Sequence, residues 1–257
     1  MLHRAAYAEL GLDWRYDAIE VRPEELARFL AGLGGEWAGL SLTMPLKQTV
    51  LPLLDEVSDL ATATGAANTV VLGTGRRRGD NTDVAGIVAA LREAGVDRVR
   101  GSVVLGGGAT AASALAALGQ LGDPAPHVLV RSTSRPDPLR QAADRLGLAP
   151  RIGRLPRDSA LLAEPGIDVV VNTTPAGALD GWVPLLQGSG HAVLLDVVYD
   201  PWPTPLARAW SGPVVGGAAM LLHQAARQVE LMTGLAAPLR AMRAAMLLSR
   251  PTALPPI

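Results

Sequence analysis

This sequence of 257 residues contains no cysteine, a single phenylalanine and a single lysine. Without cysteine the chain can form neither a disulfide bond nor a thiolate metal site. Arg, Glu, Gln or Gly interrupts each apolar run well before it reaches bilayer length, so we predict no membrane-spanning segment. Glu9 falls where a signal peptide would carry its apolar core, so we predict no secretory leader. Together these absences favour a cytoplasmic protein that does not bind membranes.

Charge is also scarce in this chain. Charged residues make up 18% of the sequence and apolar residues 49%, with a net charge of -1, which is typical of a globular protein and not of a disordered one. There is no basic excess, so we predict no nucleic-acid partner. The histidines lack the spacing of metal ligands, and we predict no metal site; they are His3, His127, His191 and His223.

The hydrophobic pattern changes near residue 84. Before that point we expect helices over 1–11 and 22–34, strands over 15–21 and 37–45, a partly helical stretch over 49–65 and a hairpin over 66–83. Beyond it, continuous apolar strands alternate with helices up to residue 217, and helices over 218–234 and 239–248 close the chain. We therefore predict an α/β fold with two domains: a first domain with a mixed, mostly parallel sheet, and a Rossmann-type dinucleotide-binding domain over 84–217.

The segment "VVLGGGATAASAL" contains a glycine-rich turn between an apolar strand and a helix. Gly106, Gly108 and Ala111 follow the G-x-G-x-x-A pattern, and Gly107, Ala109 and Thr110 lie between them. The first glycine permits the tight turn, the second lets the backbone approach a pyrophosphate, and the small third residue permits close packing of helix on strand. The pattern predicts a dinucleotide site at the start of this helix.

The end of the next strand indicates which dinucleotide binds. An NAD site carries Asp or Glu there for the ribose 2′-hydroxyl, whereas this strand ends in "LVRSTSR". Arg131, Ser132 and Arg135 match the charge and the hydrogen-bonding geometry of a 2′-phosphate. We therefore predict NADP(H) as the cofactor; the competing interpretation is that these are ordinary loop arginines.

All three asparagines of the chain precede a threonine, in "GAANTVV", "GDNTDVAG" and "VVNTTPAG". Asn68, Asn81 and Asn172 fall at predicted strand ends, where ligand sites of α/β proteins lie, although each pair alone could be simple turn chemistry. Asp83 follows the second pair at the start of a helix, where it could cap the helix and also serve a site.

The motifs "GLSLTMPLK", "TGAANTV", "GDNTDVAG", "LGGGATA", "VVNTTPAG", "DVVYDPWPTPL" and "GGAAMLLHQA" occur in this order. As an ordered set they resemble the shikimate dehydrogenase family, from the first residue to about Gly234. The resemblance implies reversible, NADPH-dependent reduction of 3-dehydroshikimate to shikimate, on the route to chorismate and the aromatic amino acids. It also implies a discontinuous substrate-binding and catalytic domain, 1–83 with 218–257, an NADP-binding domain over 84–217, and a monomer or homodimer.

By residue matching, the resemblance makes Lys47 the catalytic lysine and Asp83 its partner. An ammonium group can approach a ketone oxygen and give up a proton, whereas a guanidinium group is effectively never deprotonated. This explains a lysine in a chain that otherwise uses arginine; whether Lys47 donates the proton itself or a water relays it stays open. The same matching implies substrate contacts by Thr43, Asn68, Tyr199 and Gln224, and further cofactor contacts by Thr173, Gly217 and Met220.

The sequence departs from the family pattern at its start. The family opens with a strand and a loop of "SLSP" type whose serines bind the substrate carboxylate, whereas "MLHRAAYAELGLD" matches the helix that follows. We expect a natural form to carry an upstream segment. Gly216 stands where the family often has Asp, and Ser41 replaces the usual Asn.

Two alternative functions remain from the sequence. One is a quinate or shikimate dehydrogenase that prefers NAD, against which Arg131 and Arg135 argue. The other is a non-catalytic, regulatory NADP-binding paralogue, against which the presence of Lys47 with Asp83 argues.

Overall fold

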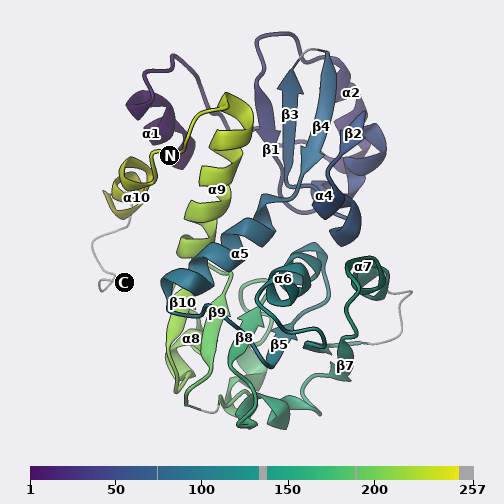
Figure 1. Cartoon of the computed structure of the whole chain (residues 1–257), viewed down its shortest axis with the longest axis vertical. Helices are drawn as coiled ribbons and strands as arrows, with labels where there is room; N and C mark the ends of the chain where they lie inside the picture. The colour runs from purple at the N-terminus through teal and green to yellow at the C-terminus, as the bar shows by residue number, and fades with distance from the viewer. Residues whose placement is uncertain (74, 133–137, 189, 249–257) are drawn as a thin grey trace. The chain divides into compact units, whose positions relative to one another are not determined.

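The computed structural model describes residues 1–73, 75–132, 138–188 and 190–248. The chain forms two compact units, one of Met1–Gly86 with Leu221–Ile257 and one of Ile87–Met220 (Figure 1). The chain passes between the units inside two helices, α5 (Thr82–Glu93) and α9 (Gly217–Thr233). The first unit is therefore built from both ends of the chain.

The first unit contains a four-stranded sheet. Its strands are β1 (Gly39–Ser41), β2 (Glu56–Val57), β3 (Thr69–Gly73) and β4 (Arg76–Asp80), in the order β1-β3-β4-β2. β2 pairs with β4 in parallel, while the β1–β3 and β3–β4 pairings are antiparallel. The predicted mixed sheet is confirmed, but antiparallel pairings predominate because a short turn can join β3 and β4 only as a hairpin.

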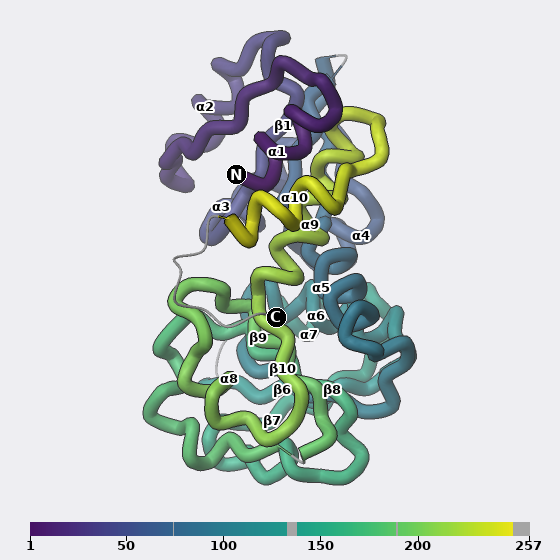
Figure 2. Tube along the Cα trace, turned by 90° about the vertical axis from the view of Figure 1, so that its left-hand side faces the viewer, coloured from purple at the N-terminus to yellow at the C-terminus, as the bar shows by residue number. Residues whose placement is uncertain are grey.

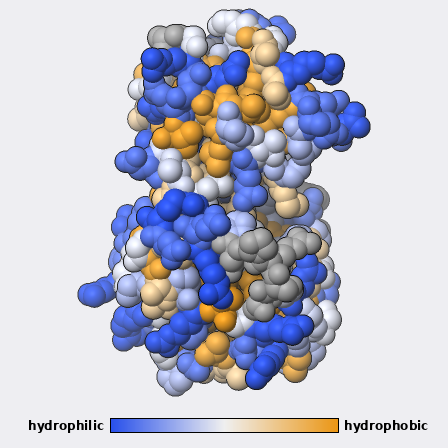
Figure 3. Space-filling view, turned by 90° about the vertical axis from the view of Figure 1, so that its right-hand side faces the viewer, coloured by the Kyte–Doolittle hydropathy of each residue, from blue (hydrophilic) through white to orange (hydrophobic). Residues whose placement is uncertain are grey.

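Helices and turns complete the core of this unit. They are α1 (Leu2–Glu9), the 3₁₀ turn Pro23–Glu25, α2 (Leu26–Ala31), α3 (Leu46–Thr49), the 3₁₀ turn Leu51–Leu53, α4 (Asp59–Thr64) and α10 (Leu239–Leu248). α1 and α10 lie side by side although they come from opposite ends of the chain (Figure 2). Leu26, Leu30 and Val70 are central to a buried apolar cluster. Further apolar side chains are only partly buried around this cluster, and Figure 3 shows apolar surface on this unit among hydrophilic residues.

The strand predicted over residues 15–21 is wrong. This segment has no strand partner among the described residues and forms no regular structure. Arg4 of α1 donates hydrogen bonds to the Tyr16 carbonyl (2.8 Å) and to Asp17 (2.9 Å), and the Tyr16 ring stacks on His3 with the ring centroids 4.1 Å apart. The segment is therefore held by side-chain contacts with α1, and an alternating pattern without a neighbouring strand does not make a ladder.

The second unit contains a six-stranded, wholly parallel sheet. Its strands are β5 (Ser102–Leu105), β6 (His127–Val130), β7 (Arg151–Arg154), β8 (Val169–Asn172), β9 (Val193–Asp196) and β10 (Val214–Gly216). The order β10-β9-β8-β5-β6-β7 is that of a Rossmann fold, with the direction of winding reversed between β5 and β8. The helices around it include α6 (Ala109–Gln120), α7 (Pro138–Leu146) and α8 (Pro205–Ala209), together with the 3₁₀ segments Ser159–Ala163 and Asp180–Leu185 (Figure 1).

Burial explains why this sheet could be predicted from the sequence. Every residue of β5, β8 and β9 is buried, as expected for strands that are covered on both faces. The strand β7 was not predicted, because the sequence "RIGR" carries charge at both ends and pairs only with β6 at the edge of the sheet. The two-residue strand β2 was also missed, because so short a segment has no readable period.

Candidate active site

In the first unit, Lys47 and Asp83 form an ion pair. Lys47 lies on the short helix α3 after Pro45, and Asp83 lies in the first turn of α5. Lys47 Nζ donates a hydrogen bond to Asp83 Oδ2 at 2.6 Å, and the two side chains are only 15% and 6% exposed. Limited solvent access strengthens the attraction relative to a surface pair. The backbone holds the lysine in place, because its carbonyl accepts a hydrogen bond from Ala67 N at 2.8 Å.

Asn68 binds the other oxygen of the same carboxylate. Its Nδ2 lies 2.8 Å from Asp83 Oδ1, 2.9 Å from Thr82 Oγ1 and 3.2 Å from Gln224 Oε1. The amide orientation follows from Oδ1, which accepts a hydrogen bond from the backbone N–H of Thr82 at 2.8 Å. Since the amide has two N–H groups for three acceptors, the charged Asp83 holds one of them most strongly, and the weaker Gln224 contact is the easiest to exchange.

Thr82 is a site residue that the sequence interpretation missed. It is 1% exposed, and its backbone N–H and its hydroxyl both contact Asn68 Oδ1, at 2.8 and 3.1 Å. The signal was present in the sequence, because Thr82 is the threonine of the second Asn-Thr pair. Asn81 of that pair accepts a hydrogen bond from Asp83 N at 3.1 Å, so it orders the start of α5. In the same unit Thr43 is exposed to solvent.

The arrangement places a cation, a carboxylate and an amide in contact, with the cation partly accessible. Within the described residues, Asp83 is the one hydrogen-bond partner of Lys47 Nζ. The ammonium group therefore keeps N–H donors for a ligand, while Asp83 and Asn68 fix its position. Such a group can donate a hydrogen bond or a proton to an oxygen on which negative charge develops.

In the second unit, the glycine turn lies at the carboxyl end of β5, beside the switch point between β5 and β8. Gly106 has φ +115°, and a Cβ there would lie 2.5 Å from Thr173 Oγ1, so only glycine fits. Gly108 caps α6 with no side-chain hydrogen bond, and a Cβ on it would meet no atom within 4 Å. The first turn of α6 thus presents uncapped N–H groups toward open space, and it contains no acidic residue. This geometry fits a dinucleotide pyrophosphate.

The other predicted cofactor residues fall along the same edge of the sheet. Arg131 and Ser132 are exposed directly after β6, whereas Arg135 lies outside the described residues. Thr173 follows β8, and both its N–H and its hydroxyl donate to the Leu105 carbonyl, at 2.9 and 2.8 Å. Because β6 and β8 both flank β5, the parallel sheet brings these strand ends together.

Gly217 and Met220 lie on the first turns of α9, and Met220 is 7% exposed. A Cβ on Gly217 would lie 2.1 Å from the Val197 carbonyl oxygen, so this close approach of two backbones requires glycine. Tyr199 follows β9 and is 55% exposed. The second unit thus presents a glycine-rich turn and a set of strand-end loops at one edge.

Comparison with known proteins agrees with this architecture. Two family profiles match the chain: "Shikimate dehydrogenase substrate binding domain" over residues 1–70 and "Shikimate 5'-dehydrogenase C-terminal domain" over residues 217–247. Shikimate dehydrogenase (NADP(+)) of Halobacterium salinarum is 37% identical over 254 residues, which cover 95% of this chain and 92% of that protein.

Two solved structures are also similar. Shikimate dehydrogenase of Mycobacterium tuberculosis superposes with a TM-score of 0.85 at 40% identity, covering 95% of this chain and 93% of that one. Shikimate 5-dehydrogenase of Thermus thermophilus, solved in complex with NADP(H) and shikimate, has a TM-score of 0.82 at 30% identity, covering 97% and 93%.

A Rossmann sheet with an uncapped glycine turn in the second unit, together with a lysine–aspartate pair in the first, defines a dinucleotide-dependent oxidoreductase. The chain belongs to the shikimate dehydrogenase family. Over the described residues, no helix has both the length and the apolar character needed to cross a bilayer.

Proposed function

We propose that this chain catalyses the reversible, NADPH-dependent reduction of 3-dehydroshikimate to shikimate, in the pathway to chorismate and the aromatic amino acids. The observation that carries the proposal is the partly buried Lys47–Asp83 pair, 2.6 Å apart, in a chain of this family. The family evidence favours this function over an NAD-preferring quinate dehydrogenase or a non-catalytic paralogue.

The reaction needs a hydride for the ketone carbon and a proton for the ketone oxygen. NADPH supplies the hydride when bound. Lys47 donates a hydrogen bond to the ketone oxygen and stabilises the negative charge that develops there, and the proton that completes the alcohol comes from Lys47 or from a water that it orients. Asp83 keeps the ammonium group in place and balances its charge. In the reverse direction the same groups receive the proton of the alcohol.

The neighbouring polar side chains are proposed to bind the substrate. Asn68 and Gln224 hold ring hydroxyls, since the 3.2 Å contact between their side chains can be exchanged for contacts to a ligand. Thr43 and Tyr199 present hydroxyl groups that are proposed to contact the ring substituents or the carboxylate. We place substrate binding and catalysis in 1–83 with 218–257, and cofactor binding in 84–217.

For the cofactor, the residues Gly106 to Ala111 would hold the pyrophosphate with backbone N–H groups. Arg131, Ser132 and Arg135 would contact the 2′-phosphate, which favours NADP(H) over NAD(H). Gly217 and Met220 would lie near the nicotinamide, and Thr173 would pack near the cofactor. We further propose a cytoplasmic protein that acts as a monomer or homodimer.

The test is an assay of the purified chain with NADP⁺ and shikimate, in which the formation of NADPH is measured by its absorbance. The proposal expects turnover with NADP⁺ and shikimate that exceeds turnover with NAD⁺ or with quinate. Binding of NADP⁺ without turnover of either acid would indicate the non-catalytic paralogue, and faster turnover of quinate with NAD⁺ would indicate the alternative enzyme.

A further inference from the structure

A buried carboxylate without a charged partner lies at the carboxyl end of β9. Asp196 is the last residue of that strand, is fully buried, and forms no ion pair with any described residue. Its carboxylate accepts three hydrogen bonds: Oδ2 from Thr204 Oγ1 at 2.6 Å, and Oδ1 from Asn172 Nδ2 at 3.0 Å and from Val198 N at 3.2 Å. Burial raises the pKa of this carboxyl above its usual value, although these hydrogen bonds act in the opposite direction.

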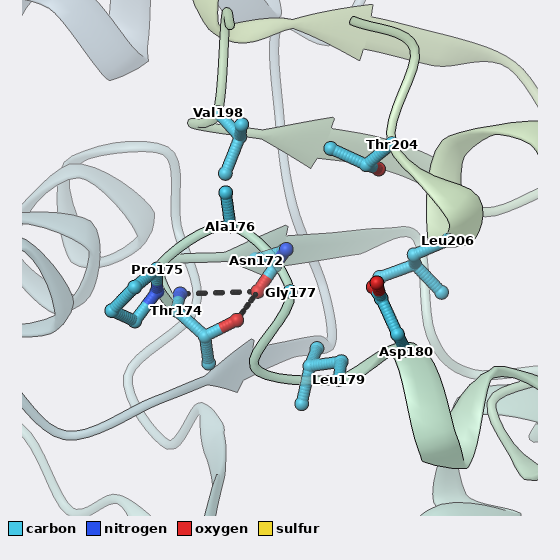
Figure 4. A pocket seen from close by; sticks show the side chains of 10 residues that line it. All are labelled: Asn172, Thr174, Pro175, Ala176, Gly177, Leu179, Asp180, Val198, Thr204 and Leu206. Atoms are coloured by element: carbon cyan, nitrogen blue, oxygen red, sulfur yellow. Dashed lines mark hydrogen bonds between the residues drawn. The ribbon is translucent and has the colours of Figure 1, made fainter. Parts of the chain in front are cut away.

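The donor Asn172 connects Asp196 to the glycine turn through a chain of contacts. Asn172 ends β8, and its Oδ1 accepts hydrogen bonds from Thr174 N at 3.1 Å and from Thr174 Oγ1 at 2.7 Å (Figure 4). Thr173, between these two residues, donates to the Leu105 carbonyl and lies against Gly106, where a Cβ would come within 2.5 Å of its hydroxyl. The carboxylate thus orders the loop that packs on the nucleotide-binding turn.

The other two donors lead to the loop after β9. The carbonyl of Val198 accepts the N–H of Gly217 at 3.3 Å, at the first residue of α9. Thr204 caps α8, because its hydroxyl accepts a hydrogen bond from Ala207 N at 3.0 Å. A single side chain therefore joins the ends of β8 and β9, and through Val198 it also reaches the start of α9.

We propose that Asp196 is a positioning residue of the cofactor site: its carboxylate fixes the Thr173–Thr174 loop and the Val198–Gly217 contact, and so sets the affinity for NADP(H). This inference rests on the proposed function, because it assumes that Thr173, Gly217 and the glycine turn bind the cofactor. Two substitutions of Asp196 are expected to have different effects. Alanine would remove the acceptor of the buried Asn172 amide, the buried Thr204 hydroxyl and the half-buried Val198 N–H.

Asparagine, in contrast, can keep the arrangement. Its amide oxygen can replace Oδ1 and accept from Asn172 and Val198, while its amide nitrogen donates to Thr204 Oγ1, whose hydroxyl hydrogen can rotate away. If hydrogen-bond geometry is what matters, Asp196→Asn should rescue most of what Asp196→Ala loses. A general loss of core stability, in contrast, would not make the affinity for NADP⁺ depend on which residue replaces Asp196.

A second buried carboxylate of the same unit provides a matched control. Asp123 is 2% exposed and accepts hydrogen bonds from Ser102 Oγ at 2.6 Å and from Ala125 N at 2.9 Å. Ser102 begins β5, so Asp123 lies at the opposite, amino-terminal edge of the sheet, away from the glycine turn. Asp123→Ala removes a comparable buried carboxylate without touching the loops that follow β8 and β9.

The experiment measures the Kd of NADP⁺ by isothermal titration calorimetry for the full chain and for the folded variants, whose folding is verified by circular dichroism. Asp196→Ala should raise this Kd by about tenfold or more, Asp196→Asn by less than about threefold, and Asp123→Ala should leave it unchanged. Thr174→Val removes a single hydroxyl donor and should raise the Kd by about two- to fivefold. If Asp196→Ala does not fold, the Kd values of Thr174→Val and Asp196→Asn test the proposal instead.

An unchanged Kd in folded Asp196→Ala, or in Thr174→Val, would overturn the proposal. An Asp196→Asn variant that binds as weakly as the alanine variant would also overturn it, because charge and not hydrogen-bond geometry would then matter. Failure of the proposed function gives a different result: the unaltered chain itself would bind NADP⁺ without turning over shikimate, or would not bind it.

Discussion

Asp83 bridges Lys47 and Asn68 with its two carboxylate oxygens, at 2.6 Å from Lys47 Nζ and 2.8 Å from Asn68 Nδ2. Lys47 lies on α3, Asp83 lies on α5, and Asn68 directly precedes β3. The ammonium group is therefore held in one place while part of it stays accessible. This relationship carries the proposed chemistry.

Replacing Lys47 should remove turnover and leave cofactor binding intact. Lys47→Ala and Lys47→Arg should each lower kcat for shikimate oxidation by about 10²- to 10⁴-fold, because neither side chain can transfer a proton at this position. The Kd of NADP⁺, measured by calorimetry, should not change. Gln48→Ala, on the adjacent exposed residue of α3, is the control and should keep normal kcat. Near-normal turnover by Lys47→Arg would contradict a proton-transfer role.

Two glutamines one turn apart on α9 should have separable effects. Gln224 contacts Asn68 at 3.2 Å near the accessible site, so Gln224→Ala should raise KM for shikimate about tenfold with little change in thermal stability. Gln228 is 1% exposed; it accepts from Ser41 at 2.8 Å and donates to Thr69 at 3.0 Å. Gln228→Ala should instead destabilise the fold by roughly 2 kcal/mol or more. Steady-state kinetics and thermal unfolding of both variants test this, and equal effects on KM would count against it.

Arg131 should discriminate between the two cofactors. It is exposed directly after β6, where a 2′-phosphate would need a cation. Arg131→Ala should raise KM for NADP⁺ about tenfold and leave KM for NAD⁺ unchanged, because only the former carries the phosphate. Arg157→Ala, at a guanidinium that is 85% exposed elsewhere in the same unit, is the control. A parallel loss for both cofactors would assign Arg131 a structural role.

His3 should make the stability of the first unit depend on pH. Its side chain is 4% exposed, its Nε2 has no hydrogen-bond partner within the described residues, and its ring stacks on Tyr16 and meets Tyr7 edge-on. Burial lowers the pKa of His3 from 6.5 to about 4, although a hydrogen bond with Gln228 acts in the opposite direction.

The folded pKa of His3 lies below the ordinary value of 6.5, so the unfolded chain binds more protons between the two values. The contribution of neutral His3 to the unfolding free energy is therefore fully present above pH 6.5. It is lost as the pH falls toward 4, by roughly 3 kcal/mol in total. His3→Phe keeps an aromatic ring but cannot titrate. Its urea unfolding free energy should depend less steeply on pH than that of the unaltered chain, and identical slopes would contradict the prediction.

Much of the second unit could be predicted from the sequence because its determinants are local. A run such as "SVVL" followed by "GGGATA" specifies a buried strand, a turn that needs glycine and a helix start, and Gly106 has the positive φ that this turn requires. In the first unit the same reasoning failed over residues 15–21. A strand depends on a neighbouring strand, and that neighbour is not a local property of the sequence.

By itself, the sequence determined the alternation of strands and helices, the glycine turn, the charge at the end of β6, and the presence of Lys47, Asp83 and Asn68 as candidates for chemistry. Only the tertiary structure decided which of these groups touch: Gln224 reaches Asn68 across 156 positions, and Thr82 and Asp196 emerged as centres of buried hydrogen bonds. The reason is physical. Periodicity and turn chemistry act over a few residues, whereas a buried polar group must find partners from any part of the chain that the packing brings near it.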